Sequence, residues 1–152
     1  MGSWLGRAAA RSRMSVAQLV EDYHLQIPLE TTRVGWLRLP PLQSDVLQRL
    51  ADLARMKIGL LQDIQTPCSW RCECRSCPYC TKCLFVNPED VTSPMWKRQW
   101  FNPEFEHCTI HAEPLESLPA GRVRRCRNFD DIVKLISRKE QRRRLLQQFY
   151  RH

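Results

Sequence analysis

The chain has 152 residues, of which 43% are hydrophobic and 26% are charged. This composition excludes a disordered tail, and no apolar run reaches the roughly 18 residues of a membrane-spanning helix, so we expect no membrane partner. Two values are unusual for a chain of this size: eight cysteines and a net charge of +8.

The first 14 residues hold Arg7, Arg11 and Arg13 among alanines and serines, and they contain no acidic residue. This composition predicts a basic, flexible N-terminus over residues 1–14. A mitochondrial transit peptide is the alternative, which makes the mitochondrion the minor alternative for localisation.

Two short elements are predicted next. Ser15 and Gln18 form a capping-box pattern, which favours a helix over residues 16–25. Residues 31–39 alternate loosely between polar and apolar side chains, and this alternation predicts a short strand.

The longest helix is predicted over residues 44–64. Ser44 can cap its N-terminus, and Pro67 lies beyond its end. Its apolar residues share one stripe: Leu47, Leu50, Ala54, Ile58 and Leu61. Lys57 and Gly59 weaken its middle.

The cysteines indicate a metal site. The spacing Cys80-x-x-Cys83, followed after 24 residues by Cys108-x-x-His111, is typical of a structural zinc ion held by three cysteines and one histidine. A second, all-cysteine site is also predicted, from Cys68, Cys72, Cys74 and Cys77. An iron–sulfur cluster is a lesser alternative, and disulfides are disfavoured because the first residues lack the apolar core of a signal peptide.

The aromatic residues between the two ligand pairs allow two interpretations. Trp96, Trp100, Phe101 and Phe105 alternate with Lys97 and Arg98. They could stack on nucleic-acid bases, or they could cover the zinc site and pack on the helix at 44–64, which we favour.

No enzyme motif is complete. His111 and Glu113 match half of the zinc-deaminase signature, but the Pro-Cys-x-x-Cys half does not follow them. The chain also lacks a glycine-rich phosphate loop. We therefore predict a protein that is not an enzyme and takes no small-molecule substrate.

The net charge lies at the C-terminal end. Residues 122–151 hold eleven basic and three acidic residues, and the rest of the chain is balanced. Asn128 can cap a basic amphipathic helix over residues 128–152, with Asp130 and Asp131 favourable in its first turn. The arginines interrupt its apolar stripe, so the last two turns are expected to face a partner or solvent.

The basic segment is the predicted contact for RNA or for an acidic protein partner. The residues assigned to that contact are Arg138, Lys139, Arg142, Arg143, Arg144 and Arg151. A solvated helix face or a nuclear-import patch is the alternative.

The order of these features resembles the large early-region-four regulatory protein of adenoviruses. The shared features are a leucine-rich helix, the run WRCECRSCPYC, the aromatic patch MWKRQWFNPEF and the basic end RKEQRRRLLQQFYRH. The resemblance implies a zinc-containing adaptor that recruits a host elongin–cullin ubiquitin ligase and affects viral mRNA export. It also implies an elongin contact through Leu47, Leu50 and Ala51.

Two lesser resemblances concern single segments. The cysteine run before a basic segment is similar to lentiviral Tat transactivators. The stretch RQWF before His107 and Cys108 is similar to the zinc-binding part of polyomavirus small T antigens.

Together these observations predict an α-rich, small, zinc-stabilised domain with two long helices flanking an irregular Cys/His centre. Its parts are the basic N-terminus at 1–14, a helix and zinc-binding core at 15–127, and the basic helix at 128–152. The expected function is that of a nuclear and cytoplasmic adaptor, with RNA-binding regulation of transcription or mRNA export as the alternative.

Overall fold

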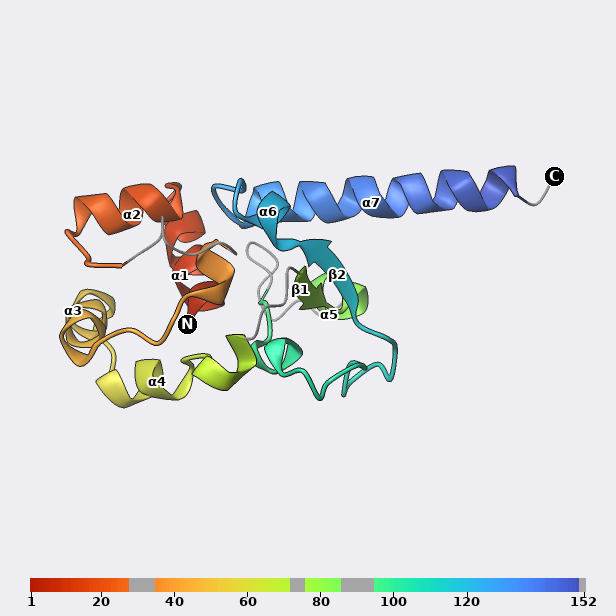
Figure 1. Ribbon diagram of the computed structural model, residues 1–152. Coiled ribbons are helices and arrows are strands. Elements are labelled where there is room, and N and C mark those ends of the chain that lie inside the picture. Colours follow the sequence, from red (N-terminus) through yellow and green to blue (C-terminus); the bar gives the residue numbers. More distant parts are fainter. Residues whose placement is uncertain (28–34, 72–75, 86–94, 151–152) are drawn as a thin grey trace.

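The computed structural model describes residues 1–27, 35–71, 76–85 and 95–150. In these residues the chain forms seven α-helices, short 3-10 helices and two strands. Helices α1 to α4 lie together and the strands and α5 lie beside them, while α7 begins near α1 and α6, runs past the strands and projects beyond them (Figure 1). Within the described residues no helix combines the length and the apolar character that crossing a membrane requires.

The expected flexible N-terminus is wrong, because residues Gly2–Arg11 form helix α1. Its buried residues are Gly2, Leu5, Gly6 and Ala9, which recur with helical spacing. The two glycines let α1 approach the 3-10 helix at Trp36–Arg38 closely, since a Cβ at either position would overlap that segment. A stripe made mostly of glycine and alanine carries little hydrophobic signal, which is why the sequence pattern did not reveal it.

Helix α2 spans Val16–Asp22, close to the predicted 16–25. The capping box is present: the Gln18 amide donates to Ser15 Oγ and the Ser15 amide donates to Gln18 Oε1. The strand expected over 31–39 lies partly outside the described residues, and its described part is the 3-10 helix Trp36–Arg38 instead.

The long helix expected over 44–64 is two helices, α3 at Ser44–Ala54 and α4 at Ile58–Asp63. Arg55 adopts the left-handed conformation with φ 50° and ends α3. Ser44 is the first helical residue rather than the cap, which is Gln43. Of the two long helices predicted, the first is therefore interrupted.

A small β-unit carries the cysteine pair. Strand β1, Ser76–Tyr79, pairs antiparallel with β2, Glu116–Pro119, so that Tyr79 lies opposite Glu116. Helix α5, Thr81–Phe85, follows β1, and α6, Ala120–Val123, follows β2. The remaining 3-10 helices are Cys68–Arg71 and Arg98–Phe101.

Helix α7 spans Phe129–Phe149 and confirms the predicted C-terminal helix. Asn128 caps it by accepting a hydrogen bond from the Asp131 amide. The face that carries Phe129, Ile132 and Ile136 is buried in the core. All ten residues of its last turns, 141–150, are exposed, as the interrupted stripe predicted.

The aromatic residues are part of the core. Trp96, Trp100 and Phe101 are buried, and the Trp96 ring lies 5.6 Å from that of Tyr79 and 6.0 Å from that of Trp100. Arg98 donates to the backbone carbonyls of Asp63 and Gln65, next to the end of α4. These three rings are therefore core residues and are not available for base stacking, whereas Phe105 is half-buried.

Candidate metal centre

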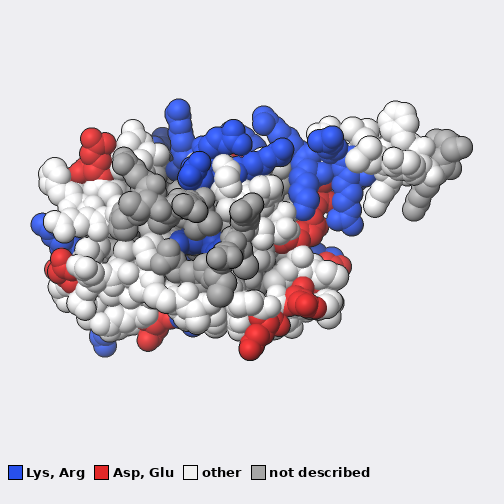
Figure 2. Space-filling view, in the orientation of Figure 1, with Lys and Arg blue, Asp and Glu red and all other residues white. Residues whose placement is uncertain are grey.

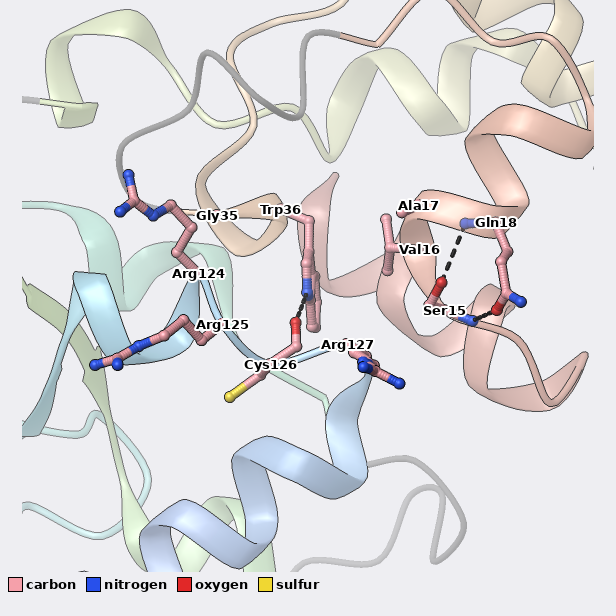
Figure 3. A pocket seen from close by; sticks show the side chains of 10 residues that line it. All are labelled: Ser15, Val16, Ala17, Gln18, Gly35, Trp36, Arg124, Arg125, Cys126 and Arg127. Carbon is pink, nitrogen blue, oxygen red and sulfur yellow. Dashed lines mark hydrogen bonds between the residues drawn. The ribbon is translucent and has the colours of Figure 1, made fainter.

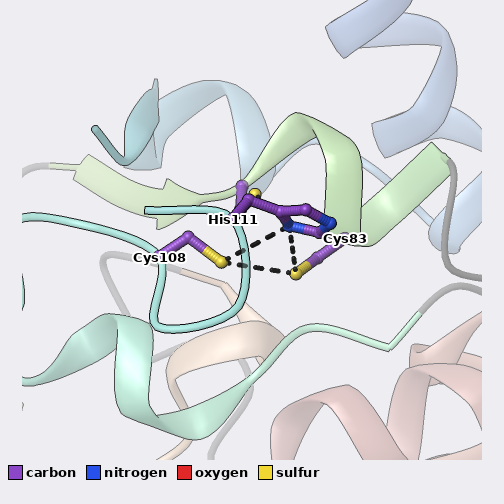
Figure 4. A group of neighbouring side chains, drawn as sticks. Cys83, Cys108 and His111 are labelled. Carbon is purple, nitrogen blue, oxygen red and sulfur yellow. Dashed lines mark hydrogen bonds between the residues drawn. The ribbon is translucent and has the colours of Figure 1, made fainter. Parts of the chain in front are cut away.

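Four predicted zinc ligands meet at one point. The ligand atoms of Cys80, Cys83, Cys108 and His111 all lie within 4.8 Å of one another. The three cysteines are buried and His111 is half-buried. Figure 4 shows the Cys83 and Cys108 sulfurs converging on the His111 ring.

The distances match a shared cation better than a hydrogen-bonded group. His111 Nδ1 lies 3.4 Å from the Sγ atoms of both Cys80 and Cys83, and 3.6 Å from Cys108 Sγ. A ring nitrogen carries either one lone pair or one hydrogen, so it cannot form three hydrogen bonds at once. Tetrahedral zinc, with Zn–S near 2.3 Å and Zn–N near 2.0 Å, requires about 3.5 Å between sulfur and nitrogen.

The first pair of ligands lies at the junction of β1 and α5. Cys80 directly follows the strand, and the Leu84 amide donates to its carbonyl at 3.1 Å, which turns the chain into α5. Cys83 is one helical turn further along and returns to the same side. The Cys-x-x-Cys spacing thus works here as a knuckle.

The second pair lies in a closed loop. The Cys108 amide donates to the Glu113 carbonyl at 2.7 Å, and the Ala112 amide donates to the Cys108 carbonyl at 2.8 Å. Outside this turn, the Leu115 amide donates to the Glu106 carbonyl at 2.8 Å. These bonds hold Cys108 and His111 on the inner side of the loop.

The electrostatics of the two neighbouring thiols differ. Burial opposes ionisation of Cys108, but hydrogen bonds from the backbone amides of His111 and Ile110 outweigh it and lower the pKa of Cys108 to about 6. Burial, followed by the hydrogen bond with Cys108, raises the pKa of Cys83 to about 12. A bound cation would hold both as thiolates, so metal binding here releases protons.

Ion pairs join the metal centre to its surroundings. Lys82, between the first two ligands, lies 2.7 Å from Glu113 beside the second pair. Glu116 accepts from Thr81 Oγ1 at 3.2 Å and lies 2.8 Å from Lys139 Nζ and 3.2 Å from Arg143 Nη1 on α7. Glu116 thereby fastens α7 to the unit that carries the ligands.

This arrangement places the residues of the predicted basic contact in different surroundings. Lys139 and Arg143 are paired with Glu116, and Lys139 Nζ also donates to Tyr79 Oη at 3.3 Å. Arg138, Arg142 and Arg144 are exposed on α7, whereas Arg151 lies outside the described residues. Sequence reasoning did not identify Glu116, because the register that places it beside Tyr79 follows from strand pairing alone.

The second predicted cysteine site is not assembled from the residues described. Cys72 and Cys74 lie outside the described residues, and Cys68 is exposed. Cys77 is fully buried, and burial raises the pKa of its thiol to about 12. Because side chains alternate along a strand, Cys77 and Tyr79 face the interior of the molecule.

The residues predicted to contact elongin are in the core. Leu47, Leu50 and Ala51 are each at most 2% exposed. These side chains pack inside the molecule, so α3 offers them to no partner in this conformation. The reason is that one apolar stripe serves equally well for a core or for an interface.

The chain was compared with known proteins. No protein-family model, no curated protein and no solved structure matches it.

Proposed function

We propose that the chain is a zinc-binding regulatory module without a catalytic role, in which Cys80, Cys83, Cys108 and His111 hold one structural Zn²⁺. The observation that carries this proposal is the approach of three sulfurs to a single ring nitrogen at 3.4–3.6 Å. Thiolate and imidazole ligands in a tetrahedral arrangement favour zinc.

The role proposed for the ion is to join two parts of the fold that are distant in sequence. One ligand pair belongs to β1 and α5, and the other to the loop before β2. Four protein ligands complete a tetrahedral shell and leave no position for a reacting water. Glu113, the acid of the partial deaminase match, is paired at the surface with Lys82, which also favours a structural centre.

An adaptor role is the second candidate, and one observation favours it. The end of α7 carries four exposed apolar side chains: Leu145, Leu146, Phe149 and Tyr150. Phe149 and Tyr150 are 79% and 87% exposed. Apolar residues grouped on a projecting helix end are typical of protein-binding surfaces, so this end of α7, rather than α3, is the place where we propose that a protein partner binds.

The zinc proposal is tested by measuring the metal content of purified protein by elemental analysis and native mass spectrometry. We expect at least one equivalent of zinc, and a second equivalent would assign the other four predicted cysteines as well. In the variant Cys83→Ser, one equivalent should be lost, because a serine hydroxyl does not replace a thiolate ligand.

Cys126→Ser is the matched control. Cys126 lies outside the four-residue cluster, and its Sγ donates to the Arg122 carbonyl, which a serine hydroxyl can also do. This variant should keep its full zinc content. Less than about half an equivalent in the wild type, or equal losses in both variants, would contradict the proposed centre.

A further inference from the structure

A basic surface extends over α6, the α6–α7 connection and the first part of α7. Lys and Arg side chains gather along the edge formed by α6 and the first part of α7 (Figure 2). We call this surface the basic groove and define it by six residues that line two adjoining hollows: Arg122, Arg124, Arg125, Arg127, Lys134 and Arg138.

The two hollows adjoin each other. The first, of about 360 Å³, lies between the start of α2 and the α6–α7 connection (Figure 3). The second, of about 340 Å³, lies between α6 and α7. Both are lined by Arg125 and Cys126, so they meet at these residues.

The positive charge of the basic groove is not neutralised by the described part of the chain. The ion pairs of the described residues involve Lys82, Lys139 and Arg143, and none of these three lines the groove. Asp131 is the single acidic residue among those lining the two hollows, and its carboxylate accepts a hydrogen bond from the Arg127 amide. All six basic residues are exposed.

The lining also indicates the kind of ligand. A protein interface usually has an apolar or aromatic centre, but Trp36 in the groove is only 5% exposed and its Nε1 donates to the Cys126 carbonyl. Large exposed apolar side chains of α7 lie at its far end, outside the groove. The groove therefore combines charge and hydrogen-bond donors with small apolar patches from Val16, Ala17 and Leu135, but it exposes no large aromatic anchor.

We infer that the basic groove binds the phosphodiester backbone of nucleic acid. Arginine forks match phosphate geometry, and several of them along two adjoining hollows can contact successive phosphates. Because no aromatic ring is accessible in the groove, binding depends on the backbone and not on base identity. This inference goes beyond the zinc proposal, since none of the six residues is a metal ligand.

The expected salt dependence and the expected loss of affinity follow from counterion release. Six contacts to a single strand predict a log–log salt slope of about −4, because each contributes about −0.7. Removing three contacts should reduce the slope to about −2 and weaken binding on the order of 100-fold at 0.1 M salt.

The test uses the full chain and fluorescence anisotropy with three probes: a 20-nucleotide single-stranded RNA of mixed sequence, the corresponding RNA duplex, and heparin as an anion without bases. The variant Arg122→Gln/Lys134→Gln/Arg138→Gln removes three groove charges. The control Arg49→Gln/Arg55→Gln/Lys57→Gln removes three exposed charges from the region of α3 and α4.

We expect the groove variant to lose RNA binding about 100-fold and the control to lose less than about fivefold. Tighter binding of the single strand or of the duplex identifies which backbone is preferred. Equal losses in the two variants would overturn the inference, because binding would then follow net charge alone. Binding of heparin without either RNA would overturn it too, and the zinc content of each variant tests the metal centre separately.

Discussion

The substitution Gly6→Ala tests whether α1 belongs to the core. A Cβ at Gly6 would overlap the six-membered ring of Trp36. That ring cannot swing away freely, because its Nε1 donates to the Cys126 carbonyl at 3.2 Å and it packs edge-on against Phe129 at 5.2 Å. Relieving the overlap therefore requires α1 or the Trp36 segment to shift.

Two effects of opposite sign determine the result. Alanine is a better helix former than glycine by about 1 kcal/mol. Overpacking a filled core costs about 1–3 kcal/mol, and we expect a cost near the upper end of this range because the Trp36 ring is held by its hydrogen bond and by Phe129. We expect Gly6→Ala to lower the free energy of unfolding by about 1–2 kcal/mol.

Gly59→Ala is the matched control within the same chain. Gly59 lies in α4, and a Cβ there would meet no atom within 4 Å. This variant should therefore raise the free energy of unfolding by up to about 1 kcal/mol, because helix propensity acts alone.

Urea unfolding of the purified protein, followed by tryptophan fluorescence, measures both variants. With an m-value of about 2 kcal/mol/M, Gly6→Ala should lower the midpoint by about 0.5–1 M. A raised midpoint for Gly6→Ala, equal to that for Gly59→Ala, would refute the packing of α1 on Trp36, and an unchanged midpoint would agree with a frayed N-terminus.

Two further predictions concern a charged contact and a helix end. Burial opposes ionisation of Glu116, but the hydrogen bond and charge of Lys139 lower the pKa of Glu116 below the ordinary 4.5. The ionised Glu116 therefore contributes its full stabilisation of the folded state above about pH 4.5, and this contribution is lost as the pH falls through the lowered pKa. Glu116→Gln should therefore lower the free energy of unfolding, measured by urea unfolding, by about 1 kcal/mol at pH 7. The difference between variant and wild type should disappear in acid, and a difference that is unchanged down to about pH 2 would contradict this prediction. Arg55→Gly should raise the melting temperature by about 2–4 °C in calorimetry, because glycine adopts the left-handed conformation at the end of α3 without strain. An unchanged or lower melting temperature would show that the left-handed conformation of Arg55 does not destabilise the folded protein.

The predictions that succeeded depend on local chemistry. The capping box at Ser15 and the Asn128 cap involve residues three apart, so neighbouring residues alone determine them. The two pairs Cys80/Cys83 and Cys108/His111 were also predictable, because each is set by a short spacing within one turn, whereas their approach to one another is a property of the tertiary structure.

The predictions that failed depend on what each element packs against. The apolar stripe continues across the break at Arg55, so periodicity favoured one helix although Lys57 and Gly59 weakened its middle. Leu47 and Leu50 satisfy an interface pattern, yet they face the core. Both errors come from the same limit: a stripe of apolar residues identifies a buried face without identifying its partner.

The sequence by itself determined the two ligand pairs, the caps at Ser15 and Asn128, and the concentration of positive charge near the C-terminus, since each is a property of neighbouring residues. Only the tertiary structure decided which charges are available to a partner. The pairing of β1 with β2 places Glu116 where it pairs with Lys139 and Arg143, whereas Arg122, Lys134 and Arg138 are exposed and have no ion pair among the described residues. Charge availability depends on contacts between segments distant in the chain, and no local pattern of residues encodes those contacts.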